Sequence, residues 1–313
     1  MAIAFTFPGQ GSQAVGMGKA LADRFFEARA VFETVDEALG EKLSEIIWEG
    51  PADRLTLTEN AQPALMAVSL AAVRALEARG VRLRHPIAYV AGHSLGEYSA
   101  LAAAGALSVA DAARLLRIRG RAMQDAVPVG TGAMVALIGL DLAAACEVAA
   151  EAAGGDICQA ANDNGAGQVV ISGHRTAIER AIVIAGKKGA KRVLPLPVSA
   201  PFHCALMQPA AEAMAEALAG VELRAPTVPL VANAIARPIT DPAEIRRRLV
   251  EQVTSMVRWR ESIEWLTGAG VDVFVEVGAG RVLSGLARRI AAGAETMAVG
   301  GPDDIEPAVN RLA

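Results

Sequence analysis

The sequence predicts an α/β fold, with a mostly parallel sheet in the core and a small inserted subdomain. Three observations carry this prediction. Apolar residues make up 53% of the chain but aromatics only 4%, so the apolar content is mainly Ala, Val and Leu, which suits helices packed on a buried sheet. Short apolar runs end in Gly-rich turns that lead into helices. From Gly132 onward, the order of predicted elements changes.

The first 126 residues alternate short apolar runs with helical segments. We predict strands at Ala2–Phe7 and 87–91, and helices from about Gly18, at 61–79, from Glu97 and at 108–126. Pro63 near the start and Gly80 after the end are typical of the second helix. Ser108 is a typical N-cap for the last one, with Asp111 three residues later.

The segment 127–197 predicts an inserted subdomain. We expect strands at 133–139, 157–162, 168–173 and 191–196, and helices at 142–153 and 177–188. This order, β-α-β-β-α-β, is the ferredoxin-like pattern. Pro128 and the pair Pro195 and Pro197 mark its edges. The α/β core is then predicted to comprise residues 1–126 and 198–313. Within 198–313 we expect helices at 209–220 and 243–252, strands at 228–232 and Val271–Val277, and a last helix after Gly280.

Composition excludes several classes of function. The formal net charge of −4 argues against nucleic acid as the main partner. No apolar run is long enough to cross a bilayer, and residues 1–10 lack the basic start and long apolar stretch of a signal peptide. The three cysteines are widely spaced, without a CxxC pair, so neither a disulfide framework nor a metal site is indicated. We expect a cytoplasmic protein.

A serine nucleophile is predicted at Ser94. Gly92-His93-Ser94-Leu95-Gly96 matches GxSxG between a predicted strand and a predicted helix. A serine on such a sharp turn needs small residues two positions away on both sides. The turn would lift Oγ beside a helix N-terminus, whose free N–H groups can stabilise an oxyanion. A chance GxSxG is the alternative, and the strand–turn–helix context argues against it.

Elimination selects the base, because the chain has only four histidines. His93 adjoins the serine and its side chain should diverge from Oγ. His85 lies upstream of the strand, and His174 is expected at the surface near an N-cap. His203 remains, where the chain returns from the insert to the core, with a partly buried structural histidine as the alternative. No acid stands out as a third member, so a backbone carbonyl would orient the imidazole.

Arg119 is an anomaly in the helix 108–126. It falls on the same helical stripe as apolar residues such as Leu115 and Leu116, whereas Arg114, Arg117 and Arg121 group on another face and are expected to be solvated. A core-facing guanidinium needs a carboxylate or several carbonyls. Periodicity alone favours a structural ion pair; the alternative is a bidentate grip on a substrate carboxylate.

Taken together, six segments resemble one family, the malonyl-CoA:acyl carrier protein transacylases. The resemblance runs from about residue 4 to residue 290, in order and with similar spacing. The segments are Phe7-Pro8-Gly9-Gln10-Gly11-Ser12-Gln13, Gly92-His93-Ser94-Leu95-Gly96-Glu97-Tyr98, Arg117-Ile118-Arg119-Gly120, Gly130-Thr131-Gly132-Ala133-Met134, Gln168-Val169-Val170-Ile171-Ser172-Gly173 and Glu276-Val277-Gly278-Ala279-Gly280.

The resemblance implies a role for each site residue. Ser94 would carry the acyl group, with His203 as general base and acid. Arg119 would hold the malonyl carboxylate, which reverses the expectation from periodicity. The backbone N–H groups of Gln10 and Leu95 would form the oxyanion hole. The position of Gln252 matches the one whose backbone carbonyl orients the histidine.

The resemblance also implies fold and partners. We expect an α/β-hydrolase-like core with the inserted ferredoxin-like subdomain, acting as a monomer. The partners would be malonyl-CoA and acyl carrier protein; the coenzyme A thioester is a substrate, and no cofactor is expected. Carrier proteins are acidic, so a basic patch is expected near the cleft. Lys187, Lys188, Lys191 and Arg192 are candidates for it, although a solvated helix end is the favoured interpretation of these four.

Two departures and three alternatives accompany the resemblance. Phe202 stands where many bacterial relatives carry Ser, and it implies malonyl rather than methylmalonyl selection. Gly278-Ala279-Gly280 replaces the commoner Gly-Pro-Gly. Fatty acid biosynthesis is the expected pathway, and a discrete acyltransferase serving a polyketide synthase is the first alternative. A GxSxG thioesterase or esterase, and a catalytically silent carrier-docking protein, are the others.

Overall fold

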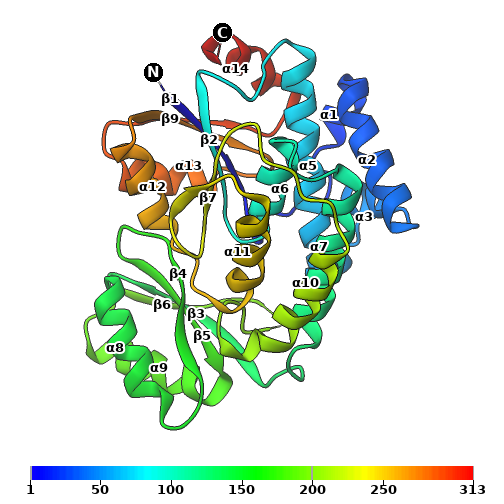
Figure 1. The fold of residues 1–313 in the computed structure, drawn as a ribbon. Coiled ribbons are helices and arrows are strands. Elements are labelled where there is room, and N and C mark those ends of the chain that lie inside the picture. Colours follow the sequence, from blue (N-terminus) through cyan, green and yellow to red (C-terminus); the bar gives the residue numbers. More distant parts are fainter. Residues whose placement is uncertain (1, 199, 313) are drawn as a thin grey trace.

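The structure, a computed structural model that describes residues 2–198 and 200–312, contains two sheets with helices packed around each (Figure 1). The larger sheet has the strand order β10-β9-β1-β2-β7-β8. Its strands are β1 (Ala2–Phe7), β2 (Ile87–Gly92), β7 (Leu230–Ala232), β8 (Arg237–Ile239), β9 (Val271–Val277) and β10 (Glu295–Val299). All neighbouring pairs are parallel except β7 and β8, which are antiparallel. The predicted α/β core with a mostly parallel sheet is confirmed.

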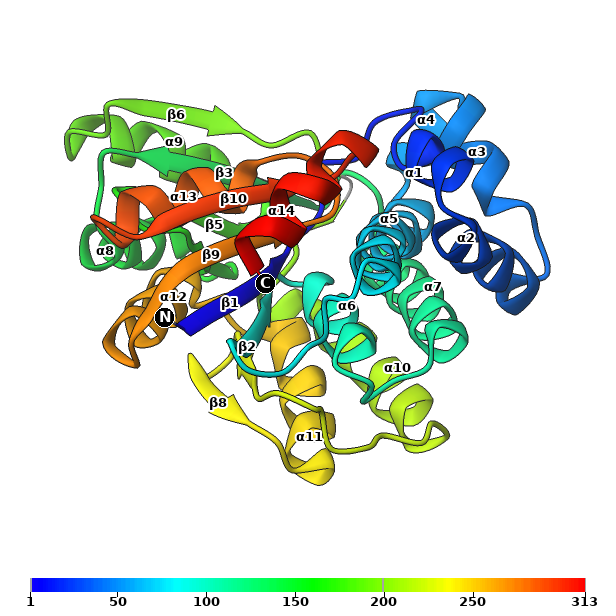
Figure 2. The ribbon, with the colours of Figure 1, turned by 90° about the horizontal axis from the view of Figure 1, so that it is seen from above.

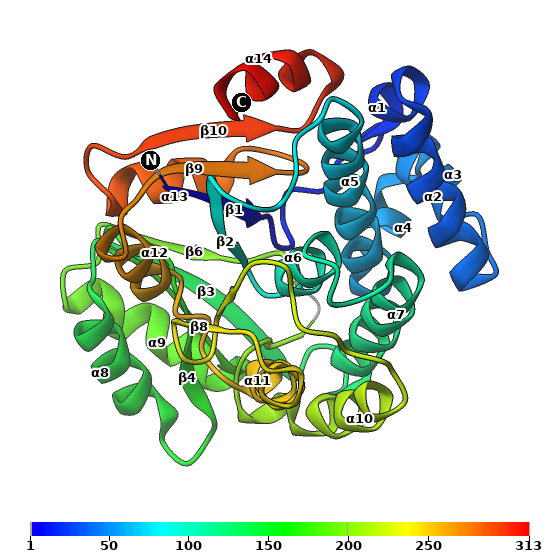
Figure 3. The same ribbon diagram turned by 45° about the horizontal axis from the view of Figure 1, so that its top comes forward.

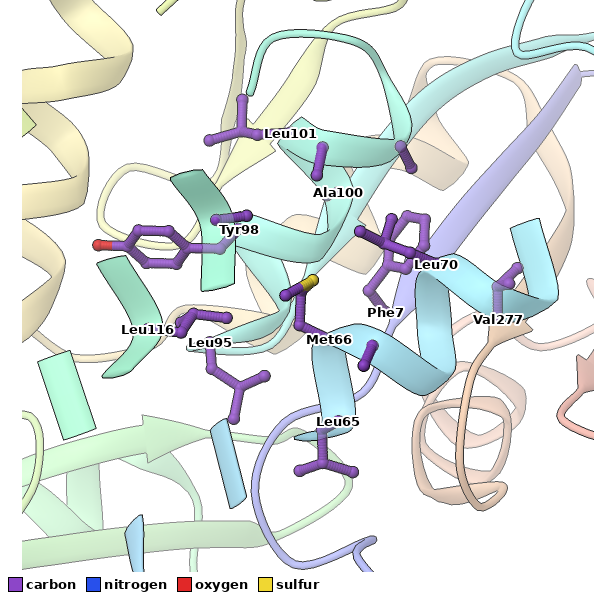
Figure 4. Packing of buried hydrophobic residues seen from close by; sticks show 14 of the residues in the cluster. Phe7, Leu65, Met66, Leu70, Leu95, Tyr98, Ala100, Leu101, Leu116 and Val277 are labelled. Atoms are coloured by element: carbon purple, nitrogen blue, oxygen red, sulfur yellow. The ribbon is translucent and has the colours of Figure 1, made fainter. Parts of the chain in front are cut away.

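Helices cover both faces of this sheet (Figure 2). On one face lie α5 (Thr58–Ala78) and α6 (Gly96–Ala103), with α2 (Phe26–Leu39) and α7 (Val109–Asp125) packed against α5; on the other lie α12 (Trp259–Gly268) and α13 (Val282–Ile290). Side chains alternate along β1: Phe5 and Phe7 join the apolar cluster that includes α5, and Ala4 joins the one that includes α12. Figure 4 shows Phe7 and Val277 facing Leu70 of α5. Burial on both faces explains why the strands read as continuous apolar runs.

The register of β1 and β2 brings two predicted loops together. Phe7 and Gly92, the last residues of the two strands, are paired, and the N–H of His93 donates to the carbonyl oxygen of Phe7. The Gly-rich turn after β1 and the GxSxG turn after β2 therefore meet at the carboxyl edge of the sheet. This edge is where open α/β sheets bind ligands.

The smaller sheet is antiparallel and has the order β4-β5-β3-β6. Its elements are β3 (Gly132–Ile138), α8 (Leu142–Ala153), β4 (Cys158–Asp163), β5 (Gln168–His174), α9 (Arg175–Lys187) and β6 (Arg192–Pro195). One face packs under α8 and α9, and the other contributes Met134 and Ala136 to the core of the larger unit. The predicted β-α-β-β-α-β order is confirmed, while the bounds at residues 127 and 197 stay a prediction.

The other helices surround the core. They are α1 (Lys19–Arg24), α3 (Leu43–Glu49), α4 (Ala52–Thr56), α10 (Gln208–Ala219), α11 (Pro242–Thr254) and α14 (Ile305–Leu312), with short 3-10 turns η1 (Ala205–Met207) and η2 (Pro302–Asp304). Figure 3 shows α10 and α11 packed side by side. Within residues 2–198 and 200–312, none of the helices combines the length and apolarity that a membrane span requires.

Two predicted elements need correction. The second helix, α5, begins at Thr58, so Pro63 lies inside it rather than at its opening. The proline removes only one backbone hydrogen bond there, and the almost completely buried helix compensates through packing. The helix after Gly280 is not the last element, because β10 and α14 follow it.

Candidate active site

Ser94 lies on a strained turn between β2 and α6. Its φ of 53° is in the left-handed region, which costs energy for a residue with a side chain. A Cβ on Gly92 would lie 1.9 Å from the carbonyl carbon of Gly96, and one on Gly96 would lie 2.3 Å from the carbonyl oxygen of Phe7. Both glycines of the GxSxG pattern are therefore required by close backbone approach.

Side chains from two other elements hold this turn at both ends. The N–H of Ser94 donates to Oδ1 of Asn233, at 2.8 Å, and the carbonyl oxygen of Ser94 accepts from Nε2 of Gln252, at 2.9 Å. Asn233 follows β7 and also donates through Nδ2 to the carbonyl oxygen of Gly92, at 2.7 Å. Because all these groups are internal to the fold, the orientation of Oγ is fixed before any ligand binds.

The structure brings His203 to the serine. Nε2 lies 2.8 Å from Oγ of Ser94, and Nδ1 lies 2.9 Å from the backbone carbonyl oxygen of Gln252. A carbonyl oxygen only accepts, so the proton of the neutral ring sits on Nδ1 and Nε2 faces the hydroxyl as an acceptor. These distances agree with two predictions: that His203 is the histidine beside Ser94, and that a backbone carbonyl orients its ring.

Burial keeps this imidazole neutral. His203 is buried, and the loss of hydration, followed by the positive charge of Arg119, lowers its pKa to about 3. The hydrogen bond to Gln252 acts in the opposite direction. The ring is therefore unprotonated at neutral pH, the form that can accept a proton from a hydroxyl.

Arg119 points into the same site from α7. Its side chain is almost fully buried, and it donates to Oε1 of Gln62 at 2.7 Å, to Oε1 of Gln252 at 2.8 Å and to Oγ of Ser94 at 3.0 Å. Among residues 2–198 and 200–312, no carboxylate forms an ion pair with this guanidinium, and its Nε has no acceptor. Arg119 is thus a buried cation surrounded by neutral oxygens, with donor capacity left over.

The neighbouring arginines behave differently, and one prediction about them was wrong. Arg114 and Arg121 are exposed as expected, but Arg117 is buried. It donates to Oδ1 of Asn60 and forms an ion pair with Glu41. The apolar stripe of α7 is wider than the sequence pattern suggested, because α2 and α5 both pack against it. Arg117 has a structural carboxylate partner, whereas Arg119 has none.

A cavity of about 340 Å³ connects these groups, a size suited to a small acyl group and its thioester. Gln10 and Leu95 line it together with Ser94 and His203. The backbone N–H groups of Gln10 and Leu95 donate to no acceptor in the part of the chain that the structure describes. Both are therefore available as donors beside the nucleophile. The cavity is also lined by Met134, Leu196, Pro197, Val198 and Phe202.

Several site residues escaped the sequence analysis. Gln62 and Asn233 each contact a predicted residue but belong to no motif, although Asn233 directly follows a strand at the ligand-binding edge, which is a usable signal. Glu97 was noticed as the start of a helix and as part of the segment 92–98 that carries the resemblance, but no role was assigned to it, and it is buried in the site. His93 turns away from Oγ as expected: Nε2 lies 3.0 Å from Oδ1 of Asn164. Burial lowers the pKa of this second imidazole.

Comparison with known proteins agrees with this geometry. The acyl transferase domain family matches residues 4–299. The malonyl CoA-acyl carrier protein transacylase of Bacillus subtilis is 46% identical over 311 residues, covering 99% of this chain and 97% of the relative. A crystal structure of acyl-carrier-protein-S-malonyltransferase from Bartonella henselae is 58% identical, with a TM-score of 0.98 and coverage of 100% and 99%.

A third comparison includes a partner. A malonyl-transacylase solved in complex with its type II PKS acyl-carrier protein is 42% identical, with a TM-score of 0.95 and coverage of 99% of this chain and 100% of that one. All three similarities extend over nearly the whole length of both chains. The chain belongs to the acyl transferase domain family, among the malonyl CoA-acyl carrier protein transacylases.

Proposed function

We propose that this protein transfers a malonyl group from coenzyme A to the pantetheine thiol of an acyl carrier protein, through a malonyl ester of Ser94. The observation that carries the proposal is that His203 and Arg119 both lie within hydrogen-bond distance of Oγ of Ser94. Oγ of Ser94 lies 2.8 Å from a neutral histidine nitrogen and 3.0 Å from a buried guanidinium that forms no ion pair with any residue that the structure describes. A nucleophile, its base and a carboxylate receptor thus share one cavity.

In the first half-reaction, Oγ attacks the thioester carbonyl while Nε2 of His203 accepts the hydroxyl proton. The N–H groups of Gln10 and Leu95 donate to the oxyanion that develops on the carbonyl oxygen. The C–S bond then breaks, and the imidazolium returns its proton to the departing coenzyme A thiolate. The carbonyl of Gln252 holds the ring through Nδ1 throughout.

In the second half-reaction, the carrier-protein thiol gives its proton to His203 and attacks the ester carbonyl. The C–O bond to Ser94 breaks, and the imidazolium protonates Oγ as it leaves. Both halves use the same base and oxyanion donors, so the cycle is ping-pong. No group outside the chain and its two substrates is needed to balance either step.

Arg119 selects the acyl group in this proposal. A malonyl carboxylate would replace neutral amide oxygens as the partner of the guanidinium, and charge-assisted bidentate pairs are stronger than neutral ones. Neutral acyl groups such as acetyl would leave the buried cation without that partner. The negative charge would also offset the Arg119 charge that helps to depress the pKa of His203, which makes the base stronger when the correct substrate is bound.

The carrier protein and the pathway are part of the proposal. The relative solved with a type II PKS acyl-carrier protein supports such a partner. Of the predicted basic patch, Lys188 forms ion pairs with Glu147 and Glu151, as expected of a solvated helix end. Carrier docking at that patch, the monomeric state and the fatty-acid pathway stay predictions.

The experiment measures malonyl transfer from malonyl-CoA to holo carrier protein, with apo carrier protein, which lacks the pantetheine thiol, as the control. We expect transfer to the holo form only, with parallel double-reciprocal plots from ping-pong kinetics. Release of free malonate that outpaces transfer would instead identify a thioesterase. Running fatty-acid and polyketide carrier proteins in parallel decides between the two pathways.

A further inference from the structure

Glu97 is a buried acid that the proposed mechanism does not use. It is the second residue of α6, and its side chain is only 1% exposed. Oε1 accepts from the backbone N–H of Asn233, at 2.6 Å, and Oε2 accepts from Nε2 of Gln252. A buried acid is costly unless its oxygens are satisfied, and both of its partners touch the reacting serine.

Those two partners fix both ends of the strained turn. Asn233 accepts from the N–H of Ser94, and Gln252 donates to the carbonyl oxygen of the same residue. Gln252 also supplies the backbone carbonyl that holds His203. One carboxyl group therefore anchors the residues that orient the nucleophile and the base.

The side-chain amide of Gln252 also separates two opposite charges. Its Nε2 faces Glu97, and its Oε1 accepts from Arg119 at 2.8 Å. The charges on either side fix the orientation of the amide, because a flip would place N–H against guanidinium and oxygen against carboxylate. Glu97 compensates the guanidinium at a distance without occupying its donors. A direct ion pair between the two would have blocked the position that a substrate carboxylate needs.

The hydrogen bonds are those of the ionised acid. Both oxygens of Glu97 accept from N–H groups, and neither meets an acceptor among the residues described, so a neutral acid would direct its O–H at a donor. Burial raises the pKa of Glu97, whereas the hydrogen bonds from Asn233 and Gln252 and the charge of Arg119 lower it. Burial alone would favour the neutral acid, but the N–H donors at both oxygens assign the ionised form.

We propose that Glu97 is a positioning residue for this reaction. Through Gln252 it compensates the charge of Arg119 while leaving the guanidinium donors free for an acyl group that bears a carboxylate. Through Asn233 and Gln252 it also fixes the turn of Ser94. The identity of that acyl group rests on the proposed function. Acyl selectivity thus depends on a residue that touches neither the substrate nor the reacting atoms.

The test is E97Q, assayed with malonyl-CoA and acetyl-CoA. Glutamine keeps the size of the side chain but can present an N–H to Nε2 of Gln252, so the amide bridge to Arg119 is lost. We expect kcat/KM for malonyl-CoA to fall roughly 10- to 100-fold, the loss expected for a hydrogen bond to a charged group. Acetyl-CoA should lose less, because only the serine turn is affected, so the preference for malonyl narrows by about tenfold.

A matched control separates this role from simple destabilisation. Glu276 is equally buried and accepts from the N–H groups of Leu283 and Ser284, at 3.1 and 2.7 Å. E276Q should lower the melting temperature as E97Q does, yet keep the wild-type preference for malonyl. An equal loss of preference in both variants would overturn the inference, since it would show a general effect of removing a buried charge.

Two further variants keep the test decisive if E97Q folds poorly. Q252M keeps the backbone carbonyl that holds His203 but removes the amide, and it should narrow the preference to the same extent. In an R119M background, E97Q should lower kcat/KM for malonyl-CoA by no more than it lowers kcat/KM for acetyl-CoA, because Arg119, the residue through which Glu97 acts on selectivity, is absent. Persistence of the full malonyl-specific penalty in the double variant would contradict coupling through Arg119.

A readout without malonyl distinguishes failure of the inference from failure of the proposed function. Labelling by a fluorophosphonate needs only the serine and its base, and E97Q should slow it. A wild type that labels normally but takes up no malonyl group would sink the proposed function alone, and slower labelling of E97Q would still support the hold on Ser94. A malonyl preference that survives E97Q overturns the selectivity role, and unchanged labelling overturns the hold on the turn.

Discussion

Replacing Arg119 by methionine should remove the preference for malonyl while leaving the fold intact. Within the described part of the chain, the guanidinium makes three hydrogen bonds, to Gln62, Gln252 and Ser94, and no ion pair. A bound carboxylate would receive charge-assisted bonds worth about 3 kcal/mol together. The loss of kcat/KM for malonyl-CoA should therefore be roughly 100-fold, with acetyl-CoA turnover unchanged or increased.

The stability of R119M should change little, because removal of the desolvated guanidinium offsets the lost hydrogen bonds, and Glu97, whose pKa Arg119 helps to lower, can take up a proton once that charge is gone. We expect a shift within about 1 kcal/mol in the free energy of unfolding. R117M is the matched control. Arg117 is buried but paired with Glu41, which is 41% exposed, so solvent screens the pair and this variant should lose only about 1 to 2 kcal/mol of stability and keep its malonyl preference. The assay compares initial rates with the two thioesters, and stability is measured by urea unfolding. A malonyl-to-acetyl ratio in R119M within threefold of wild type would refute the carboxylate role.

Three other predictions concern the base, the turn and the acyl pocket. The pKa of His203 is about 3 in the folded state against 6.5 for an unperturbed imidazole, so the unfolded chain takes up a proton first as pH falls. The free energy of unfolding is therefore unaffected by this group above pH 6.5 and decreases below it. Between pH 7 and 5, wild type should lose about 2 kcal/mol more than H203Q in urea unfolding, and the same pH dependence in both proteins would contradict this. G92A places a Cβ 1.9 Å from the carbonyl carbon of Gly96, so it should cost more than about 3 kcal/mol or prevent soluble expression, and a wild-type melting temperature would show that the turn relaxes. F202S removes the ring of Phe202 from the cavity wall, so kcat/KM for methylmalonyl-CoA relative to malonyl-CoA should rise about tenfold. An unchanged ratio would show that the α-methyl group does not contact Phe202.

Helices and strands could be predicted from the sequence where an apolar segment is bounded by clear turn or cap residues. The strand Val271–Val277 and the helix Leu142–Ala153 were predicted at the observed bounds, because each lies between unmistakable turn or cap residues. The helices α2, α3 and α4 were not predicted, because their N-caps make no side-chain cap hydrogen bond and so give no start signal. Gly40, at the C-cap of α2, was a usable end signal that the prediction missed. The edge strand β10 was missed for a related reason: it is only partly buried and has a mixed composition.

Within the site, local motifs reveal the nucleophile but not its supports. The turn around Ser94 can be recognised from the GxSxG spacing, but only Gly92 has its steric cause within the turn, at Gly96; Gly96 itself approaches the carbonyl oxygen of Phe7 on β1. Arg117 and Arg119 are two positions apart, and only the packed structure shows which one has a carboxylate partner. Asn233 acts on Ser94 across 139 residues of sequence, a contact that no periodicity encodes.

Peptide mass spectrometry after brief mixing with malonyl-CoA identifies the residue that carries the acyl group. We expect one malonyl group, carried by the peptide that contains Ser94 and discharged when holo carrier protein is added. S94A should carry none, and H203A should acquire it far more slowly. A malonyl group on another residue, or transfer to the carrier protein by S94A at the wild-type rate, would contradict a mechanism that passes through the Ser94 ester.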